Sequence, residues 1–299
     1  MSTISPYDYV EDKNGWIYVV KAVLANDQII AKAFYNRIRE NHVVKCKEYF
    51  GNIKTLPENK NYNFGGPMDY VLTENDLLRI YGHDKYPILT YPNCDTIVYK
   101  IALLAEEFGF SAYLFGSRRL EIENESSDWD ILFVGDSSPF ILLNYIVEKL
   151  TPGVRFFSSS ECDNRAKRYM KRNYFNYETL SKIFRKGTLY LKRNENEIGV
   201  FFVRKTTNID FSLYSINDKA NYKINGKILQ SGGSSAFMPR EFQIQNSKQE
   251  IFCIRTVLWE IGGIEANYCT DVEFSGLYRL CDGSYWFGGK KTRMRFCNE

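Results

Sequence analysis

Two aspartates, two residues apart in a short apolar stretch, restrict the possible folds of this sequence more than any other feature. Side chains alternate between the two faces of a β-strand, so Asp128 and Asp130 point one way while Trp129 and Ile131 point into a core. Two carboxylates this close raise each other's pKa unless a cation compensates their charge. Mg²⁺ favours oxygen ligands of this kind. The stretch therefore predicts a strand that holds a divalent cation.

A Gly-Ser pair precedes this strand and supplies a second part of a site. Residues 112–115 read as a short buried strand that ends abruptly at Gly116 and Ser117. Glycine lets the backbone approach a phosphate closely, and the serine hydroxyl can donate a hydrogen bond to it. Arg118 and Arg119 follow, and guanidinium groups match phosphate oxygens because their donors form a planar fork. We therefore predict that Gly116, Ser117 and Arg118 bind nucleotide phosphates.

Together the two motifs resemble those of the nucleotidyltransferases of the DNA polymerase β superfamily. That signature is a strand ending in Gly-Ser, an aspartate-hydrophobic-aspartate strand, and a third carboxylate on a later strand. The third position falls on Asp210, because Ile209, Phe211 and Leu213 alternate with polar residues as in a strand with one buried face. The resemblance covers residues 94–215. It implies that Asp128, Asp130 and Asp210 bind Mg²⁺ or Mn²⁺ as the catalytic residues of a two-metal mechanism.

The flanking sequence agrees with the two motifs. Asp95 is placed to cap a helix that ends near Gly109, and Ser138 with Pro139 marks the start of another. The order helix, strand, strand, helix predicts a mixed sheet with helices on one face. We therefore expect an α+β protein with a polymerase-β-like core, flanked by β-rich N-terminal and C-terminal modules. The predicted boundaries are 1–93, 94–216 and 217–299.

The two terminal modules are expected to be β-rich. The N-terminal one has strands at 16–20 and 29–35, joined by a turn at 26–27, and an exposed loop over 52–67. In the C-terminal one, Asn225-Gly226 favours a tight hairpin turn, as does Asp282-Gly283, and 250–258 and 273–279 read as strands. This layout also resembles that of uncharacterised prokaryotic, especially archaeal, nucleotidyltransferase-domain proteins.

One segment, 165–193, is strongly basic and opposed locally only by Glu178, although the net charge of the chain is only +3. Aromatic residues are interleaved with its lysines and arginines. Two interpretations remain open: the segment binds RNA or another nucleic acid, or it is a solvated helix whose aromatic residues are buried. The basic residues are Arg165, Lys167, Arg168, Lys171, Arg172, Lys182, Arg185, Lys186, Lys192 and Arg193.

Composition limits the class of protein. With 299 residues, 44% of them hydrophobic, the chain can build a substantial core. It has no apolar run long enough to cross a membrane and no pattern typical of a signal peptide, so we expect no membrane partner. Its seven scattered cysteines and two histidines lack zinc-site spacing, which indicates reduced thiols in a cytoplasmic protein.

The function implied by the resemblance is enzymatic. We expect a nucleotidyltransferase that moves a nucleoside monophosphate from an NTP to an acceptor hydroxyl on RNA, protein or a small molecule, with release of pyrophosphate. The alternative is an inactive module that binds nucleotide or RNA on the same scaffold.

Overall fold

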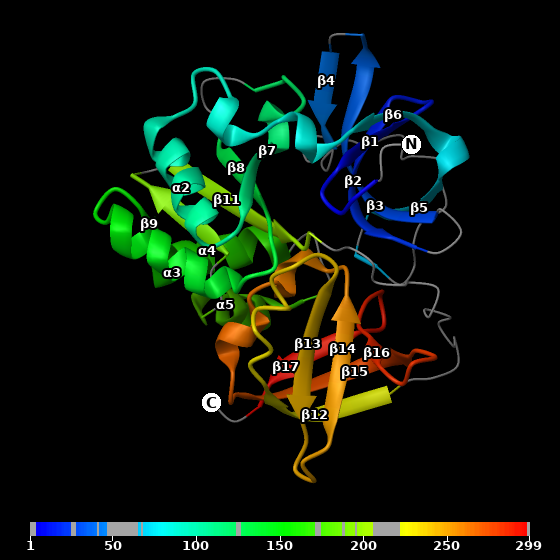
Figure 1. The fold of residues 1–299 in the computed structure, drawn as a ribbon. Coiled ribbons are helices and arrows are strands. Elements are labelled where there is room, and N and C mark those ends of the chain that lie inside the picture. The colour runs from blue at the N-terminus through cyan, green and yellow to red at the C-terminus, as the bar shows by residue number, and fades with distance from the viewer. Residues whose placement is uncertain are drawn as a thin grey trace.

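The computed structural model describes residues 4–24, 28–40, 42–46, 65–66, 68–123, 127–170, 175–186, 189–194, 196–205 and 222–297. Their strands form three sheets, drawn in Figure 1 from blue through green to red along the chain. The N-terminal sheet has the order β4-β3-β2-β1-β6, and β5 also pairs with β3. Its strands are β1 (Tyr9–Asp12), β2 (Trp16–Val23), β3 (Gln28–Arg39), β4 (His42–Lys45), β5 (Asp69–Thr73) and β6 (Leu77–Tyr81).

The central sheet carries the two sequence motifs. Its order is β7-β8-β11-β10-β9; β7 is antiparallel to β8, and β8 is parallel to β11. A buried apolar cluster joins β7, β8 and β11 to helices α2 (Thr96–Glu107) and α3 (Pro139–Leu150). Helices α4 (Ser159–Met170) and α5 (Tyr177–Lys186) follow. The strands are β7 (Ser111–Phe115), β8 (Trp129–Val134), β9 (Arg155–Phe156), β10 (Tyr190–Arg193) and β11 (Asn196–Val203).

The C-terminal sheet closes on itself. Its order is β12-β13-β14-β16-β15, and β15 pairs back onto β12, which completes a five-stranded barrel. Strand β17 is added on the outer side of β15. The strands are β12 (Tyr222–Ile228), β13 (Arg240–Gln245), β14 (Ile251–Thr256), β15 (Asp271–Arg279), β16 (Tyr285–Trp286) and β17 (Arg293–Phe296).

The expected fold class is wrong. We predicted an α+β protein organised around a polymerase-β-like core, a mixed sheet with helices on one face. The chain is instead β-rich, with several sheets, a closed five-stranded barrel, and four α-helices among the described residues. The prediction generalised from one segment, whereas the strands of 9–81 and 222–296 pair extensively and dominate the architecture. The module boundaries at 93/94 and 216/217 stay predictions.

Several local predictions are confirmed. The Asp95 carboxylate accepts hydrogen bonds from the backbone N–H groups of Ile97 and Val98 at the start of α2, and α3 begins at Pro139. The strands predicted over 16–20, 29–35, 250–258 and 273–279 are present, as is the hairpin at Asp282-Gly283, where β15 and β16 pair antiparallel. The turn at 26–27 and most of the loop over 52–67 lie outside the described residues.

The hairpin predicted at Asn225-Gly226 is wrong. Both residues lie inside β12, where Asn225 pairs with Glu273 and Gly226 with Val272 of β15. A methyl group on Gly226 would lie 2.2 Å from the Gln245 carbonyl oxygen of β13. Glycine is needed here for close approach between strands, not for a turn.

The three sheets share one interior. A single buried cluster contains Tyr9 from β1, Phe115 from β7 and Trp286 from β16. The guanidinium group of Arg119 is fully buried at this junction and donates to the carbonyl oxygens of Leu114 and Tyr7, at 2.8 and 2.6 Å. The central motifs are therefore fixed against both flanking sheets.

Candidate active site

Asp130 lies near the start of β8, an interior strand of the central sheet. In the strand register it is opposite Phe115 of β7 on one side and Gly199 of β11 on the other. Asp128 immediately precedes β8, which begins at Trp129. Both aspartates line the same two cavities, as the alternation of side chains along the strand predicts.

Two glycines make room for the Asp130 carboxylate. A methyl group on Gly116 would lie 2.2 Å from its Oδ2, and one on Gly199 would lie 2.2 Å from its Oδ1. Gly116 also has a φ of +70°, which a residue with a side chain rarely adopts. The importance of Gly116 was predicted, but that of Gly199 was missed. A glycine inside an apolar strand was the available signal, since it often marks close approach of another group.

Two cavities meet at the aspartates. The arginine cavity, of about 280 Å³, extends over β11 and is lined by Arg165, Arg168 and Arg240. The lysine cavity, of about 210 Å³, extends to Ser117 and is lined by Lys32 and Lys45. Their shared walls are Phe34, Asp128, Asp130, Tyr169, Trp259 and Glu260. The site is thus built from all three sheets, because Phe34 is on β3 and Trp259 follows β14.

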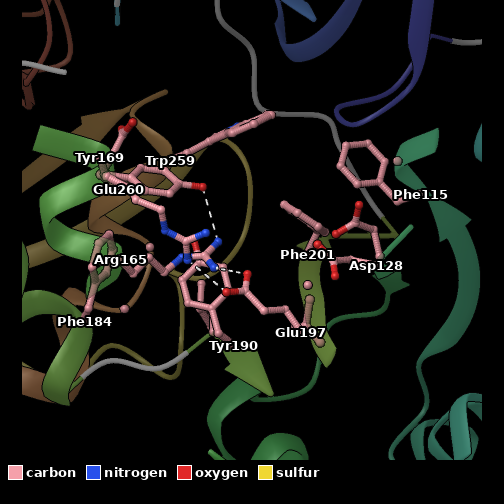
Figure 2. A pocket seen from close by; sticks show the side chains of 18 of the residues that line it. Phe115, Asp128, Arg165, Tyr169, Phe184, Tyr190, Glu197, Phe201, Trp259 and Glu260 are labelled. Carbon is pink, nitrogen blue, oxygen red and sulfur yellow. Dashed lines mark hydrogen bonds and ion pairs between the residues drawn. The ribbon is translucent and has the colours of Figure 1, made fainter. Parts of the chain in front are cut away.

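In the arginine cavity, the Arg165 guanidinium already contacts other side chains of the protein (Figure 2). Its guanidinium lies 3.4 Å from the centre of the Tyr190 ring and donates to Glu197 at 2.8 Å and to the Tyr169 hydroxyl at 3.2 Å. Arg168 donates to the same Glu197 carboxylate at 2.9 Å. Burial raises the pKa of Tyr190 to about 12, so this ring stays neutral.

Glu197 is a third carboxylate of the cavity, and sequence reasoning missed it. It precedes Ile198, the register partner of Trp129, so it lies on the same face as Asp128. Burial tends to raise the Glu197 pKa, but Arg165 and Arg168 together outweigh this effect and lower it. The carboxylate is therefore held ionised. Its place depends on the parallel pairing of β8 with β11, which no local pattern reveals.

Arg240 holds the segment that carries Trp259 and Glu260. Its guanidinium, 3% exposed, donates to the carbonyl oxygens of Leu258, Ser235, Ala236 and Trp259 at 2.8–3.2 Å. The Trp259 indole Nε1 is buried and has no hydrogen-bond partner among the described residues. A buried donor without a partner costs about 1–3 kcal/mol. A ligand with an acceptor atom at this wall would recover that energy.

The lysine cavity faces the Gly-Ser turn. Ser117 lines it together with Lys32, Tyr35, Lys45 and Cys46. Tyr35 and Lys45 are register partners on β3 and β4, so the hairpin forms one wall. Burial, followed by the nearby Asp130 charge, raises the pKa of Tyr35, which keeps its hydroxyl protonated.

The structure does not bring Arg118 and Arg119 to the cavities. Arg118 lies 3.9 Å from the centre of the Trp129 ring, on the side of β8 opposite the aspartates, and donates to the Ser127 carbonyl oxygen at 3.1 Å. Arg119 is buried at the junction of the sheets. Of the predicted phosphate ligands, Gly116 thus lines the arginine cavity and Ser117 the lysine cavity, each together with the aspartates, whereas Arg118 lines neither.

Asp210 lies outside the described residues, so its metal-binding role stays a prediction. Among the residues that are described, no group of three or more His, Cys, Asp or Glu side chains is arranged to hold a metal ion. The pair Asp128 and Asp130 nevertheless fits Mg²⁺, which commonly binds through one or two carboxylates and completes its shell with substrate phosphates and water. The space kept open around Asp130 by Gly116 and Gly199 agrees with such a role.

The basic segment is better neutralised than its sequence indicates. Glu161 pairs with Lys192, Asp163 with Arg185, Asp95 with Arg193, and Glu197 with Arg165 and Arg168. Several aromatic residues of the segment, including Phe175 and Phe184, are buried. The segment is not the single solvated helix of the second interpretation, because its described residues belong to α4, α5 and β10, although it does bury aromatic residues as that interpretation expects. Binding of nucleic acid by 165–193 stays a prediction.

Comparison of the chain with protein-family models, with curated proteins and with solved structures finds no match. Across the described parts of the chain, none of the helices combines the length and apolar character required to span a membrane.

Proposed function

We propose that the protein is a metal-dependent nucleotidyltransferase. The observation that carries the proposal is the placement of Asp128 and Asp130 at the meeting point of two cavities, with Gly116 closing over the Asp130 carboxylate. Each cavity also has cationic side chains, which suit a substrate rich in phosphate. Neither motif alone would support this function, since Gly-Ser turns and paired aspartates occur in many proteins.

In the proposed reaction, the acceptor hydroxyl oxygen forms a bond to the α-phosphorus of an NTP. The bond from that phosphorus to the bridging oxygen breaks, and pyrophosphate leaves with the electron pair. Asp128 and Asp130 would hold Mg²⁺ or Mn²⁺, which when bound would neutralise phosphate charge and lower the pKa of the acceptor hydroxyl. Gly116 and Ser117 receive the β- and γ-phosphates, and Asp210 is the candidate base for the hydroxyl proton.

The walls of the site orient the substrates and exclude water. Trp259, Phe34 and Tyr169 are shared by the two cavities and offer aromatic faces against which a base can stack. We place the reaction in the cytoplasm, where NTPs and Mg²⁺ are abundant and where thiols such as the buried Cys46 and Cys162 stay reduced.

The second candidate function is a non-catalytic module that binds nucleotide or RNA. It is favoured by exposed cations on α4 such as Arg168, whose side chain is 58% exposed. RNA is also a candidate acceptor for the enzyme, again through 165–193.

The experiment incubates the protein with labelled NTPs, Mg²⁺ or Mn²⁺, and RNA, protein or small-molecule acceptors. We expect metal-dependent label transfer with release of pyrophosphate. Asp128→Asn should abolish transfer, while the matched control Asp136→Asn, at an exposed position beyond the end of β8, should not. If the folded protein transfers no label across the whole acceptor set but still binds NTP or RNA, the binding module is the correct function.

A further inference from the structure

We propose that the lysine cavity binds the phosphate tail of the donor nucleotide, with Lys32 and Lys45 of the N-terminal sheet contacting the β- and γ-phosphates, and that the arginine cavity receives the acceptor. This inference rests on the proposed function and deepens it. Neither lysine belongs to the motifs of the central sheet, and both are contributed by a sheet for which the sequence predicts no role in binding.

The first argument is the charge that each cavity can offer. Arg165 and Arg168 both form ion pairs with the Glu197 carboxylate, and the Arg240 guanidinium donates hydrogen bonds to four carbonyl oxygens. By contrast, within the described parts of the chain Lys32 and Lys45 form no ion pair. A phosphate that entered the arginine cavity would have to displace Glu197. One that entered the lysine cavity would meet two ammonium groups without that competition.

The neighbouring Lys21 shows how a lysine with an ion-pair partner differs from Lys32. Lys21, on the strand next to β3, also approaches Trp259, with its Nζ 5.4 Å from the ring centre, compared with 5.6 Å for Lys32. However, Lys21 is 1% exposed and pairs with buried Asp69 at 2.9 Å. Lys21 is therefore a structural residue, whereas Lys32 lines a cavity.

The second argument is the position of the cavities across the sheet. In the order β7-β8-β11, the aspartates lie at β8, Ser117 follows β7, and Glu197 lies on β11. Ser117 lines the lysine cavity, whereas Glu197 and Gly199 of β11 line the arginine cavity, together with Phe115 and Gly116 at the end of β7. In phosphoryl transfer the attacking and leaving oxygens lie roughly in line on opposite sides of the phosphorus. Two cavities that meet at one aspartate pair give the leaving pyrophosphate and the acceptor separate spaces next to the metal ligands, as this arrangement requires.

The test measures equilibrium binding of inorganic tripolyphosphate in Mg²⁺ by titration calorimetry, so that it does not depend on turnover. Lys45→Gln and Lys32→Gln should each weaken binding by about tenfold or more, because each removes a charge-assisted contact. Arg168→Gln should change it by less than about twofold, as should the control Lys13→Gln at an exposed site beyond β1. Thermal melting checks that each variant folds. If Lys32→Gln does not fold, the binding measurement on Lys45→Gln alone tests the inference.

Three results would overturn the inference. These are a larger loss in Arg168→Gln than in both lysine variants, no loss in either folded lysine variant, and no binding of tripolyphosphate to the unmodified protein. Failure of the proposed function is a separate outcome. A protein that binds tripolyphosphate through Lys32 and Lys45 but transfers no label would keep this phosphate site and lose the enzyme.

Discussion

The central sheet and the C-terminal barrel both place glycine inside strand pairings, but for different reasons. In the barrel, Gly226 lets the Gln245 carbonyl oxygen of β13 approach, which the pairing of β12 with β13 requires. In the central sheet, Gly116 and Gly199 let the Asp130 carboxylate lie between them. A glycine in a strand thus signals close approach, and the identity of the approaching group separates a structural position from a functional one.

The largest effect should come from the carboxylate itself. Asp130→Asn keeps the shape of the side chain but removes an anionic metal ligand, so we expect label transfer to fall by about a thousandfold. Thermal melting of the same sample checks that the variant is folded, so that a loss of transfer reports on the carboxylate and not on unfolding. Asp136→Asn is the control. If Asp130→Asn retains transfer, the central glycines surround a structural carboxylate and the contrast with the barrel disappears.

In the barrel, Gly226→Ala should act on stability alone. Its methyl group would collide with backbone that cannot move without opening the β12–β13 pairing, so we expect a loss of about 2–4 kcal/mol in the free energy of unfolding. Urea denaturation measures this loss, and kcat of the folded fraction should be unchanged. Gly283→Ala is the control: it meets no atom within 4 Å and costs only the strain of its positive φ, about 1 kcal/mol.

In contrast to Gly226→Ala, Gly199→Ala should lower activity more than stability. Its methyl group would displace the Asp130 carboxylate, and a shift of about 1 Å at a catalytic group can lower activity about a hundredfold. We expect kcat to fall by about 10- to 100-fold with a smaller loss of stability than in Gly226→Ala, as measured by transfer kinetics and urea denaturation on the same samples. A variant that loses stability but keeps kcat would make Gly199 a second structural glycine.

The smallest effect concerns the pH dependence of the free energy of unfolding, through an ion pair of the central sheet. Arg165 and Arg168 lower the pKa of Glu197, so its stabilising contribution is present above the ordinary glutamate value, about 4.3, and is lost as the pH falls through the lowered pKa. Glu197→Gln should therefore cost about 1 kcal/mol at pH 7 and less at pH 3. Urea denaturation at both pH values checks this, with exposed Glu148→Gln as the control. Equal costs at the two pH values would contradict the ion-pair explanation.

Local sequence signals predicted local structure well. Periodicity and capping residues placed α2, α3, β7 and β8, because these elements are determined by neighbours in the chain. The same reasoning failed at Asn225-Gly226, where pairing with two other strands overrides a strong turn preference. The fold class failed for a related reason. Closure of the barrel depends on β12 meeting β15, and the pairing of strands distant in sequence leaves no local pattern.

The residues of the candidate site also fall into two groups, those that are close in sequence and those that only tertiary packing brings to the site. Asp128, Asp130, Gly116 and Ser117 belong to one short segment, and the structure places each of them at one or both of the two cavities, while their roles stay predictions. The remaining walls come from all three sheets, and Glu197, Lys32 and Trp259 reach the site only through tertiary packing. Arg118 shows the converse error, since adjacency in sequence to Ser117 did not bring its side chain to the same cavity.

The buried position of Arg119 limits which segments of this protein can be exchanged with those of other proteins. Its buried guanidinium joins the turn that carries Ser117 to the Tyr7 carbonyl oxygen, so the position of the proposed phosphate-binding turn depends on a segment more than a hundred residues earlier. Exchanging the N-terminal segment, from Tyr7 through the first sheet, for an unrelated one would leave this buried cation with only the Leu114 carbonyl oxygen as acceptor among the described residues. The first sheet and the central motifs therefore form one inheritable unit, which domain shuffling cannot separate without rebuilding Arg119 as well.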